Sequence, residues 1–204
     1  TYSSWFSEEY LSVLRASLAV FDYSPRNTLW LRSRLGETPV FHVPVTPLPP
    51  DPAQMHCDKR GVLFYGDTGG THRPPILTGL ARQFDLRIEG KLFGEPMRQA
   101  IAGARVVVNL HRHAGGMLET TRVAESLSLG ARVVSETSAD QGDHPLLEQL
   151  IRFAPEGDVA ALAAQIRAAL DAGDAPPALD DVIASGQQKL FDALTTLAIL
   201  PKTA

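Results

Sequence analysis

The sequence predicts an α/β fold, a parallel sheet with helices on both faces, joined to part of a second domain. Beyond residue 60, short apolar runs alternate with single helical segments, which is the pattern of βαβ units with right-handed crossovers. The run Val106-Val107-Val108 is β-branched throughout, as in strands covered on both faces. Gly130 directly follows an apolar helical segment, where glycine commonly ends a helix. We therefore expect a parallel sheet of five or more strands within residues 61–172.

Residues 1–45 are expected to be a remnant of the second domain. A helix should end over 11–16 and a short strand should follow over 18–21. Ser24-Pro25 combines an N-cap residue with proline at the first helical position, which predicts a helix from there to about Gly36. Another strand is expected over 40–45. The sequence begins at Thr1, as in a truncated or processed protein, and we expect the first domain of the parent protein to be larger.

Residues 46–60 are predicted to be a linker, because the four prolines of TPLPPDPAQMHCDKR block both helix and central strand. Cys57 in this segment is the only cysteine. An intrachain disulfide is therefore excluded, which favours an intracellular protein. We interpret Cys57 as a structural residue.

The third predicted part is the main domain, residues 61–175, and the fourth is a C-terminal helical segment, residues 176–204. The C-terminal helix should run from about 179 to 197. The expected strands of the main domain are 62–65, 86–88, 106–109, 133–135 and 151–153. The expected helices are about 74–83, 95–103, 118–129, 144–150 and 157–172.

Charge and hydropathy exclude some classes of function. The formal net charge is −4 and the pI is near 5.8, so the electrostatics do not favour a nucleic acid or an anionic membrane as partner. No run is long and apolar enough for a transmembrane span, and no signal-peptide pattern opens the chain. We predict no metal site, because His111 and His113 lack a third ligand nearby in the sequence.

The first strand of the main domain is followed by the glycine-rich turn GDTGGTHRPP, residues 66–75. Gly66, Gly69 and Gly70 would let the backbone approach a ligand closely, and free N–H groups at a helix start attract phosphate. Arg73 would add a cation suited to a diphosphate. The turn is neither GxGxxG nor a Walker A sequence, which argues against a nicotinamide enzyme. A plain surface turn is the alternative.

Polar residues follow two of the predicted strands. Asn109 and His111 come where the strand over 106–109 ends, and Glu136 follows the next strand. Ligands bind at the carboxyl edge of open α/β sheets, so these residues are candidates for a site. A histidine that reached a phosphate could donate a proton or a hydrogen bond to it.

The helix between these two strands carries Glu119, Arg122 and Glu125 at i, i+3 and i+6. Side chains with this spacing can lie along one side of a helix. A carboxylate at the sheet edge can accept hydrogen bonds from sugar or ribose hydroxyls. A solvated Glu–Arg–Glu ladder is the alternative.

The segment NLH…LETTRVAESLSLGARVVSE resembles the donor-binding half of GT-B glycosyltransferases, particularly the bacterial group-1-like and spore-maturation-type branches. The resemblance implies a Rossmann-like, nucleotide-sugar-binding domain over 61–175, in a cytoplasmic bacterial enzyme for which peripheral membrane association stays open. It implies that Glu125 binds the ribose and Arg73 the diphosphate, while Asn109, His111 and Glu119 lie near the transferred sugar or the phosphates. We accordingly predict His111 and Glu119 as catalytic residues. The predicted donor-binding residues are Gly66, Gly69, Gly70, Arg73, Asn109, Arg122, Glu125 and Glu136.

The same resemblance implies a nucleotide-diphosphate sugar as donor, no separate cofactor, and an acceptor that is a glycan, a lipid-linked sugar or a protein. The common retaining pattern places two glutamates eight positions apart, whereas Glu119 lies six positions before Glu125, so retention and inversion both stay open. A non-catalytic Rossmann-like module that binds a nucleotide-sugar or a partner protein is the alternative function. If the acceptor domain is incomplete, this chain should bind donor but transfer little or no sugar.

Overall fold

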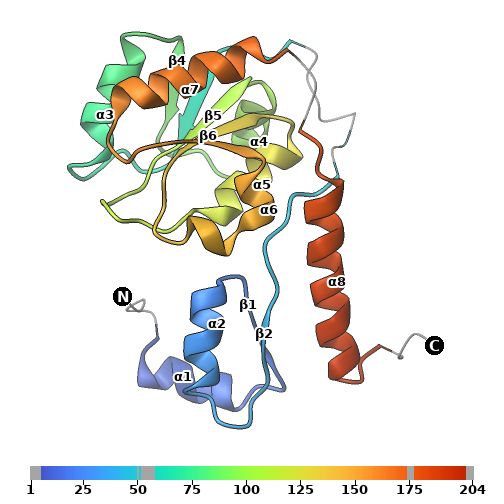
Figure 1. The fold of residues 1–204 in the computed structure, drawn as a ribbon. Helices are drawn as coiled ribbons and strands as arrows, with labels where there is room; N and C mark the ends of the chain where they lie inside the picture. The colour runs from blue at the N-terminus through green and yellow to red at the C-terminus, as the bar shows by residue number, and fades with distance from the viewer. Residues whose placement is uncertain (1–5, 50, 52–57, 174–176, 201–204) are drawn as a thin grey trace. The chain divides into compact units, whose positions relative to one another are not determined.

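The computed structural model describes residues 6–49, 51, 58–173 and 177–200. Cys57 and part of the predicted linker lie outside the described residues. The chain divides into two compact units, Thr1–Thr46 with Ala184–Ala204, and Pro47–Ile183 (Figure 1). The predicted four-part division of the chain stays a prediction.

The larger unit is built on a five-stranded sheet in the order β4-β3-β5-β6-β7, and every neighbouring pair in it is parallel (Figure 1). The predicted α/β fold class is therefore confirmed. The strands are β3 (Val62–Tyr65), β4 (Leu86–Glu89), β5 (Val106–Asn109), β6 (Arg132–Glu136) and β7 (Ile151–Ala154).

Helices cover both faces of this sheet. They are α3 (Arg73–Ala81), α4 (Gly94–Ala102), α5 (Thr120–Ser128), α6 (Pro145–Glu148) and α7 (Val159–Asp171), with a 3-10 turn, η1 (Gln141–Asp143), before α6. The expected helix over 118–129 starts two residues later, because Glu119 precedes it as the N-cap with a φ of −77° and a ψ of 71°, outside the helical region. Gly130 after α5 has a φ of +72°, as expected for a glycine that follows a helix end.

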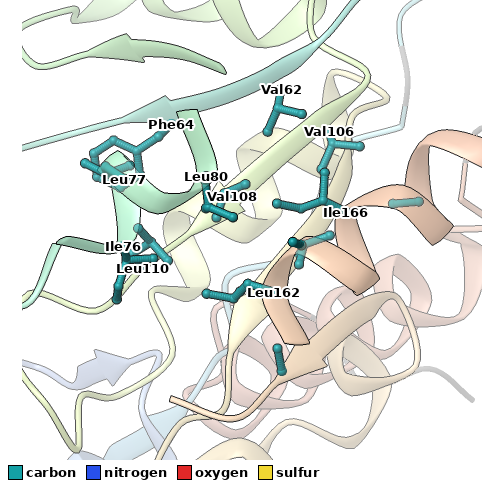
Figure 2. Packing of buried hydrophobic residues seen from close by; sticks show 14 residues of the cluster. Val62, Phe64, Ile76, Leu77, Leu80, Val106, Val108, Leu110, Leu162 and Ile166 are labelled. Atoms are coloured by element: carbon teal, nitrogen blue, oxygen red, sulfur yellow. The ribbon is translucent and has the colours of Figure 1, made fainter. Parts of the chain in front are cut away.

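Successive residues of a strand pack into hydrophobic clusters on opposite faces of the sheet. Val62 and Phe64 of β3 pack with side chains of α3 and α7 on one face of the sheet (Figure 2). Leu63 and Tyr65 point to the other face and pack with Ile101 of α4. Each fully buried aliphatic side chain of this kind contributes about 1.5–3 kcal/mol, so the two layers hold the carboxyl ends of the strands at fixed positions.

The smaller unit contains α1 (Glu8–Arg15), β1 (Val20–Asp22), α2 (Pro25–Arg32) and β2 (Val40–His42). β1 and β2 pair in parallel. The Ser24 side chain caps α2 by accepting from the Asn27 N–H at 3.3 Å, which confirms the predicted helix start. The helix α8 (Asp180–Thr196) begins in the larger unit and ends in the smaller one. A Cβ at Gly186 would collide with Cγ2 of Thr46, so α8 approaches the segment after β2 closely only because this residue is glycine.

Within the part of the chain that the structure describes, no helix combines the length and the apolar character that crossing a membrane requires.

Candidate functional site

The predicted site residues follow β3, β5 and β6 at the carboxyl edge of the sheet, or lie on α5. In the turn after β3, Gly66 has a φ of +125°, and a Cβ there would lie 2.7 Å from Nη2 of Arg122. Glycine therefore lets Arg122 lie close against this turn. The Gly69 N–H donates to the Asp67 carboxylate at 2.8 Å. That bond lowers the pKa of Asp67, as does the charge of Arg112, whose guanidinium lies 3.2 Å from it.

Arg73 is buried at the first position of α3, with 3% of its surface exposed. Its Nε and Nη2 donate to the Leu110 carbonyl at 3.1 and 2.8 Å, and its Nη1 donates to the Asp67 carbonyl at 2.7 Å. Nη2 also contacts the Glu119 carboxylate at 2.8 Å. Burial lowers the pKa of Arg73, and the charge of Glu119 opposes that shift. Arg73 thus joins the loops after β3 and β5.

Arg122 continues this network along α5. Its Nη1 lies 2.5 Å from the Glu119 carboxylate and donates to Oδ1 of Asn109 at 3.0 Å. The amide of Asn109 in turn donates to the Ser135 hydroxyl at 3.0 Å. Burial raises the pKa of Tyr65 to about 12, so its hydroxyl stays protonated and donates to the Arg122 carbonyl at 3.3 Å. Four of the predicted residues, Arg73, Asn109, Glu119 and Arg122, are therefore linked by direct contacts.

Glu125 lies outside this chain of contacts. Its carboxylate is 3.5 Å from Nη1 of Arg98 on α4, and 28% of the Glu125 side chain is exposed. Sequence reasoning missed Arg98, because nothing in its local pattern indicates that α4 lies beside α5. Glu125 keeps an accessible carboxylate next to a cation.

Glu136 is fully buried at the end of β6. Its carboxylate accepts from the backbone N–H groups of His111 and Gly157, both at 2.8 Å. The ring Nε2 of His72 lies 2.9 Å from Oε1 of the same carboxylate. The Glu136 carboxylate is therefore bound by groups from three other loops.

The His111 ring is also enclosed, since only 1% of the residue is exposed. Nε2 lies 3.2 Å from the Thr137 carbonyl, which can only accept, so this nitrogen carries the proton. Nδ1 is buried without a hydrogen-bond partner among the described residues. A Cβ on Gly116 would lie 2.8 Å from the ring, so the backbone at Gly116 covers it. The ligand contacts expected of His111 and of the other predicted residues stay predictions.

Sequence reasoning also missed three residues that follow strands. His72 lies in the turn after β3, Asp140 after β6 and Glu156 after β7. Burial alone would raise the pKa of Asp140, but hydrogen bonds from His144 and the Leu118 N–H hold it below its ordinary value. The rule that polar residues gather where parallel strands end, already applied to β5 and β6, could have found all three.

No group of three or more metal-ligating side chains occurs among the residues with described positions. Two pockets, of about 520 and 440 Å³, lie at the opposite edge of the sheet, where the strands begin. The larger includes Arg132 and Arg152 in its lining, the smaller Arg60 and Arg87. None of the predicted site residues lines either pocket.

The sheet order, the helices on both faces and the polar carboxyl edge define a Rossmann-like α/β domain. The chain belongs to the glycosyl transferase-like family, whose model matches residues 59–197. No curated protein matches the sequence.

Solved structures with TM-scores above 0.5 share the fold. AviGT4, a glycosyltransferase involved in avilamycin A biosynthesis, is 16% identical with a TM-score of 0.51, over 87% of this chain and 64% of AviGT4. HepE from Anabaena, solved in complex with UDP and glucose, is 15% identical with a TM-score of 0.60, over 96% of this chain and 68% of HepE. Sucrose-phosphate synthase from Thermosynechococcus elongatus is 16% identical with a TM-score of 0.46, over 81% of this chain and 53% of that enzyme. The chain therefore spans 64% of the length of AviGT4.

Proposed function

We propose that this chain carries the donor-binding half of a glycosyltransferase that takes its sugar from a nucleotide-diphosphate donor. Membership of the glycosyl transferase-like family supports the reaction class. The observation that carries the proposal is the linked set Arg73–Glu119–Arg122–Asn109 at the carboxyl edge of the sheet. A purely structural module has no need to gather four such groups where ligands bind in this type of sheet.

In this proposal Glu125 accepts hydrogen bonds from the two ribose hydroxyls, for which its partly exposed carboxylate is suited. The diphosphate lies over the turn of Gly66, Gly69 and Gly70. Arg73 lies behind this turn, and the Arg112 side chain is 60% exposed beside it. Their charges would stabilise the negative charge that develops on the departing nucleotide.

The transferred sugar would then lie nearest to Glu119, whose carboxylate is 30% exposed and held by two arginines. Asn109, Arg122 and Glu136 support the donor in this proposal, and His111 serves as the second catalytic residue. Because the His111 ring is enclosed, it would reach a donor only if the backbone at Gly116 moved.

The donor sugar is the only small molecule that this reaction requires besides the acceptor, which would be a glycan, a lipid-linked sugar or a protein. HepE was solved with UDP and glucose, and this supports UDP-glucose as the first donor to try. We place the protein in the cytoplasm, because a single cysteine suits a reducing compartment, and in a bacterium, because the sequence resembles the bacterial group-1-like and spore-maturation-type branches.

A second candidate is a non-catalytic module that binds the nucleotide-sugar or a protein. The structure favours it in one respect, since Arg73, Glu119 and Arg122 already satisfy one another. Release of free nucleotide from the donor, followed by chromatography with candidate acceptors, would establish the enzyme, because a binding module releases no nucleotide.

A thermal-shift screen against UDP-, GDP-, dTDP- and CMP-sugars tests the donor proposal. A bound donor at 100 times its Kd should stabilise the fold by about 2.7 kcal/mol. We expect one nucleotide class to raise the Tm and the others to leave it unchanged. If no nucleotide-sugar shifts the Tm, the donor proposal is wrong.

A further inference from the structure

The loop of residues 110–118 follows β5 and is called the β5–α5 loop below. Three carboxylates from other segments hold it by hydrogen bonds. Three of its backbone N–H groups each donate to a carboxylate from another segment of the carboxyl edge. The pairs are the His111 N–H with Glu136 Oε2 at 2.8 Å, the Gly115 N–H with Glu156 Oε1 at 2.7 Å, and the Leu118 N–H with Asp140 Oδ1 at 2.8 Å.

Glu136 differs from the other two carboxylates, because it joins several loops at once. Its Oε2 takes the His111 N–H from the β5–α5 loop, and its Oε1 takes the Gly157 N–H from the loop after β7. His72, in the turn after β3, is its third partner at 2.9 Å. Since Glu136 itself ends β6, one buried carboxylate connects the carboxyl ends of four strands.

We propose that Glu136 is a positioning residue of the donor site and does not itself touch the donor. This inference rests on the proposed function and replaces direct donor contact for this residue. By holding the His111 N–H, Glu136 fixes the start of the β5–α5 loop, whose Leu110 carbonyl receives Arg73. The same loop leads into Glu119 at the start of α5. Glu136 therefore determines where Glu119 and Arg73 meet.

The two oxygens of Glu136 explain why a carboxylate is needed. A glutamine at this position offers one carbonyl oxygen and one NH₂ group. One of the two backbone N–H groups would then face another donor, so either the β5–α5 loop or the loop after β7 would lose its partner. A buried donor left without an acceptor is costly, and the loop concerned should loosen.

Glu156 provides a matched control. Both of its oxygens accept from the same Gly115 N–H, at 2.7 and 3.0 Å. In Glu156→Gln the remaining carbonyl oxygen can still accept that bond. The two Glu→Gln variants remove the same charge from the same edge of the sheet, but only Glu136→Gln must release a loop.

The experiment measures, for the wild-type chain and both variants, the Kd of UDP-glucose by calorimetry and amide hydrogen exchange by mass spectrometry. We expect Glu136→Gln to raise the Kd about tenfold or more, since a slightly misplaced site loses much of its binding. Exchange should speed up in residues 110–118 or 155–158, while β3 and β5 stay protected. Glu156→Gln should stay near wild type in both measurements.

Two results would overturn the inference. Faster loop exchange with an unchanged Kd would mean that Glu136 holds the loops without positioning the donor site. A raised Kd with unchanged exchange would mean that Glu136 contacts the donor directly. If Glu136→Gln does not fold, Glu136→Asp serves instead: it keeps both oxygens on a shorter side chain, and the same two results decide. If wild type binds neither UDP-glucose nor another nucleotide-sugar, both the proposed function and this inference are wrong. The exchange data then still show whether Glu136 holds the loops.

Discussion

Replacing Arg73 by methionine should destabilise the larger unit far more than the same change at Arg112. Methionine keeps an unbranched apolar stem but removes every donor of the guanidinium. The Leu110 carbonyl, on a fully buried residue, then loses both of its Arg73 bonds. An unsatisfied buried polar group costs about 1–3 kcal/mol, and a lost hydrogen bond to a charged group about 1.5–3 kcal/mol.

We count only these two effects. Asp67 is an exposed residue, so its carbonyl can bond to water when the Arg73 Nη1 bond is lost, and the Glu119 side chain is 30% exposed and keeps Arg122 as partner. The expected loss for Arg73→Met is therefore about 2.5–6 kcal/mol, which includes the range of about 3–5 kcal/mol for breaking a buried ion pair. Arg112→Met breaks one pair whose side chains are 60% and 50% exposed, which should cost about 1 kcal/mol or less. Urea unfolding followed by far-UV circular dichroism measures both. Equal stability of the two variants would refute the role given to Arg73.

Two further predictions concern Gly66 and Lys59. Gly66→Ala should lower the Tm more than Gly36→Ala. Both glycines have positive φ (+125° and +62°), so backbone strain of about 1–3 kcal/mol is common to both variants, but only the Cβ at Gly66 meets another group, Arg122 Nη2 at 2.7 Å. Equal Tm losses would contradict the close approach of Arg122 to Gly66. Burial, with the charge of Arg132, lowers the pKa of Lys59 from 10.5 to about 8. Between pH 8 and 10.5 the unfolded chain therefore binds more protons than the folded chain, so the free energy of unfolding should rise with pH in this range. Lys59→Met should remove part of that rise. Identical pH profiles of wild type and Lys59→Met in urea unfolding would contradict the lowered pKa.

The strands of the larger unit could be predicted from the sequence, because buried parallel strands are short β-branched or aliphatic runs. The expected 62–65 and 106–109 agree with β3 and β5. The start of a helix was less predictable where a side chain that is distant in the sequence accepts a hydrogen bond from the backbone next to that start. The backbone at Leu118, just before α5, is held by the carboxylate of Asp140, more than twenty residues along the chain.

The sequence could indicate which residue types gather at the carboxyl edge, but not their partners. Arg73 donates to the backbone carbonyl of Leu110. Every residue type has such a carbonyl, so no sequence pattern predicts which one Arg73 contacts. The contact depends on β3 and β5 being neighbours in the sheet, which alternation of strands and helices leaves undecided. The burial of His111 and Glu136 depends in the same way on β5, β6 and β7 being neighbours, because His111 contacts the loop after β6 and Glu136 contacts the loop after β7.

The most direct test of the account is a calorimetric titration of UDP-glucose into the wild-type chain, Glu125→Ala and Glu148→Ala. Glu148 is an exposed carboxylate on α6 and serves as control. We expect wild type and Glu148→Ala to bind with equal Kd. Glu125→Ala should weaken binding by about 1.5–3 kcal/mol, roughly ten- to hundredfold in Kd. An unchanged Kd in a folded Glu125→Ala variant would show that the ribose does not lie on Glu125, and would contradict the donor site described for this edge of the sheet.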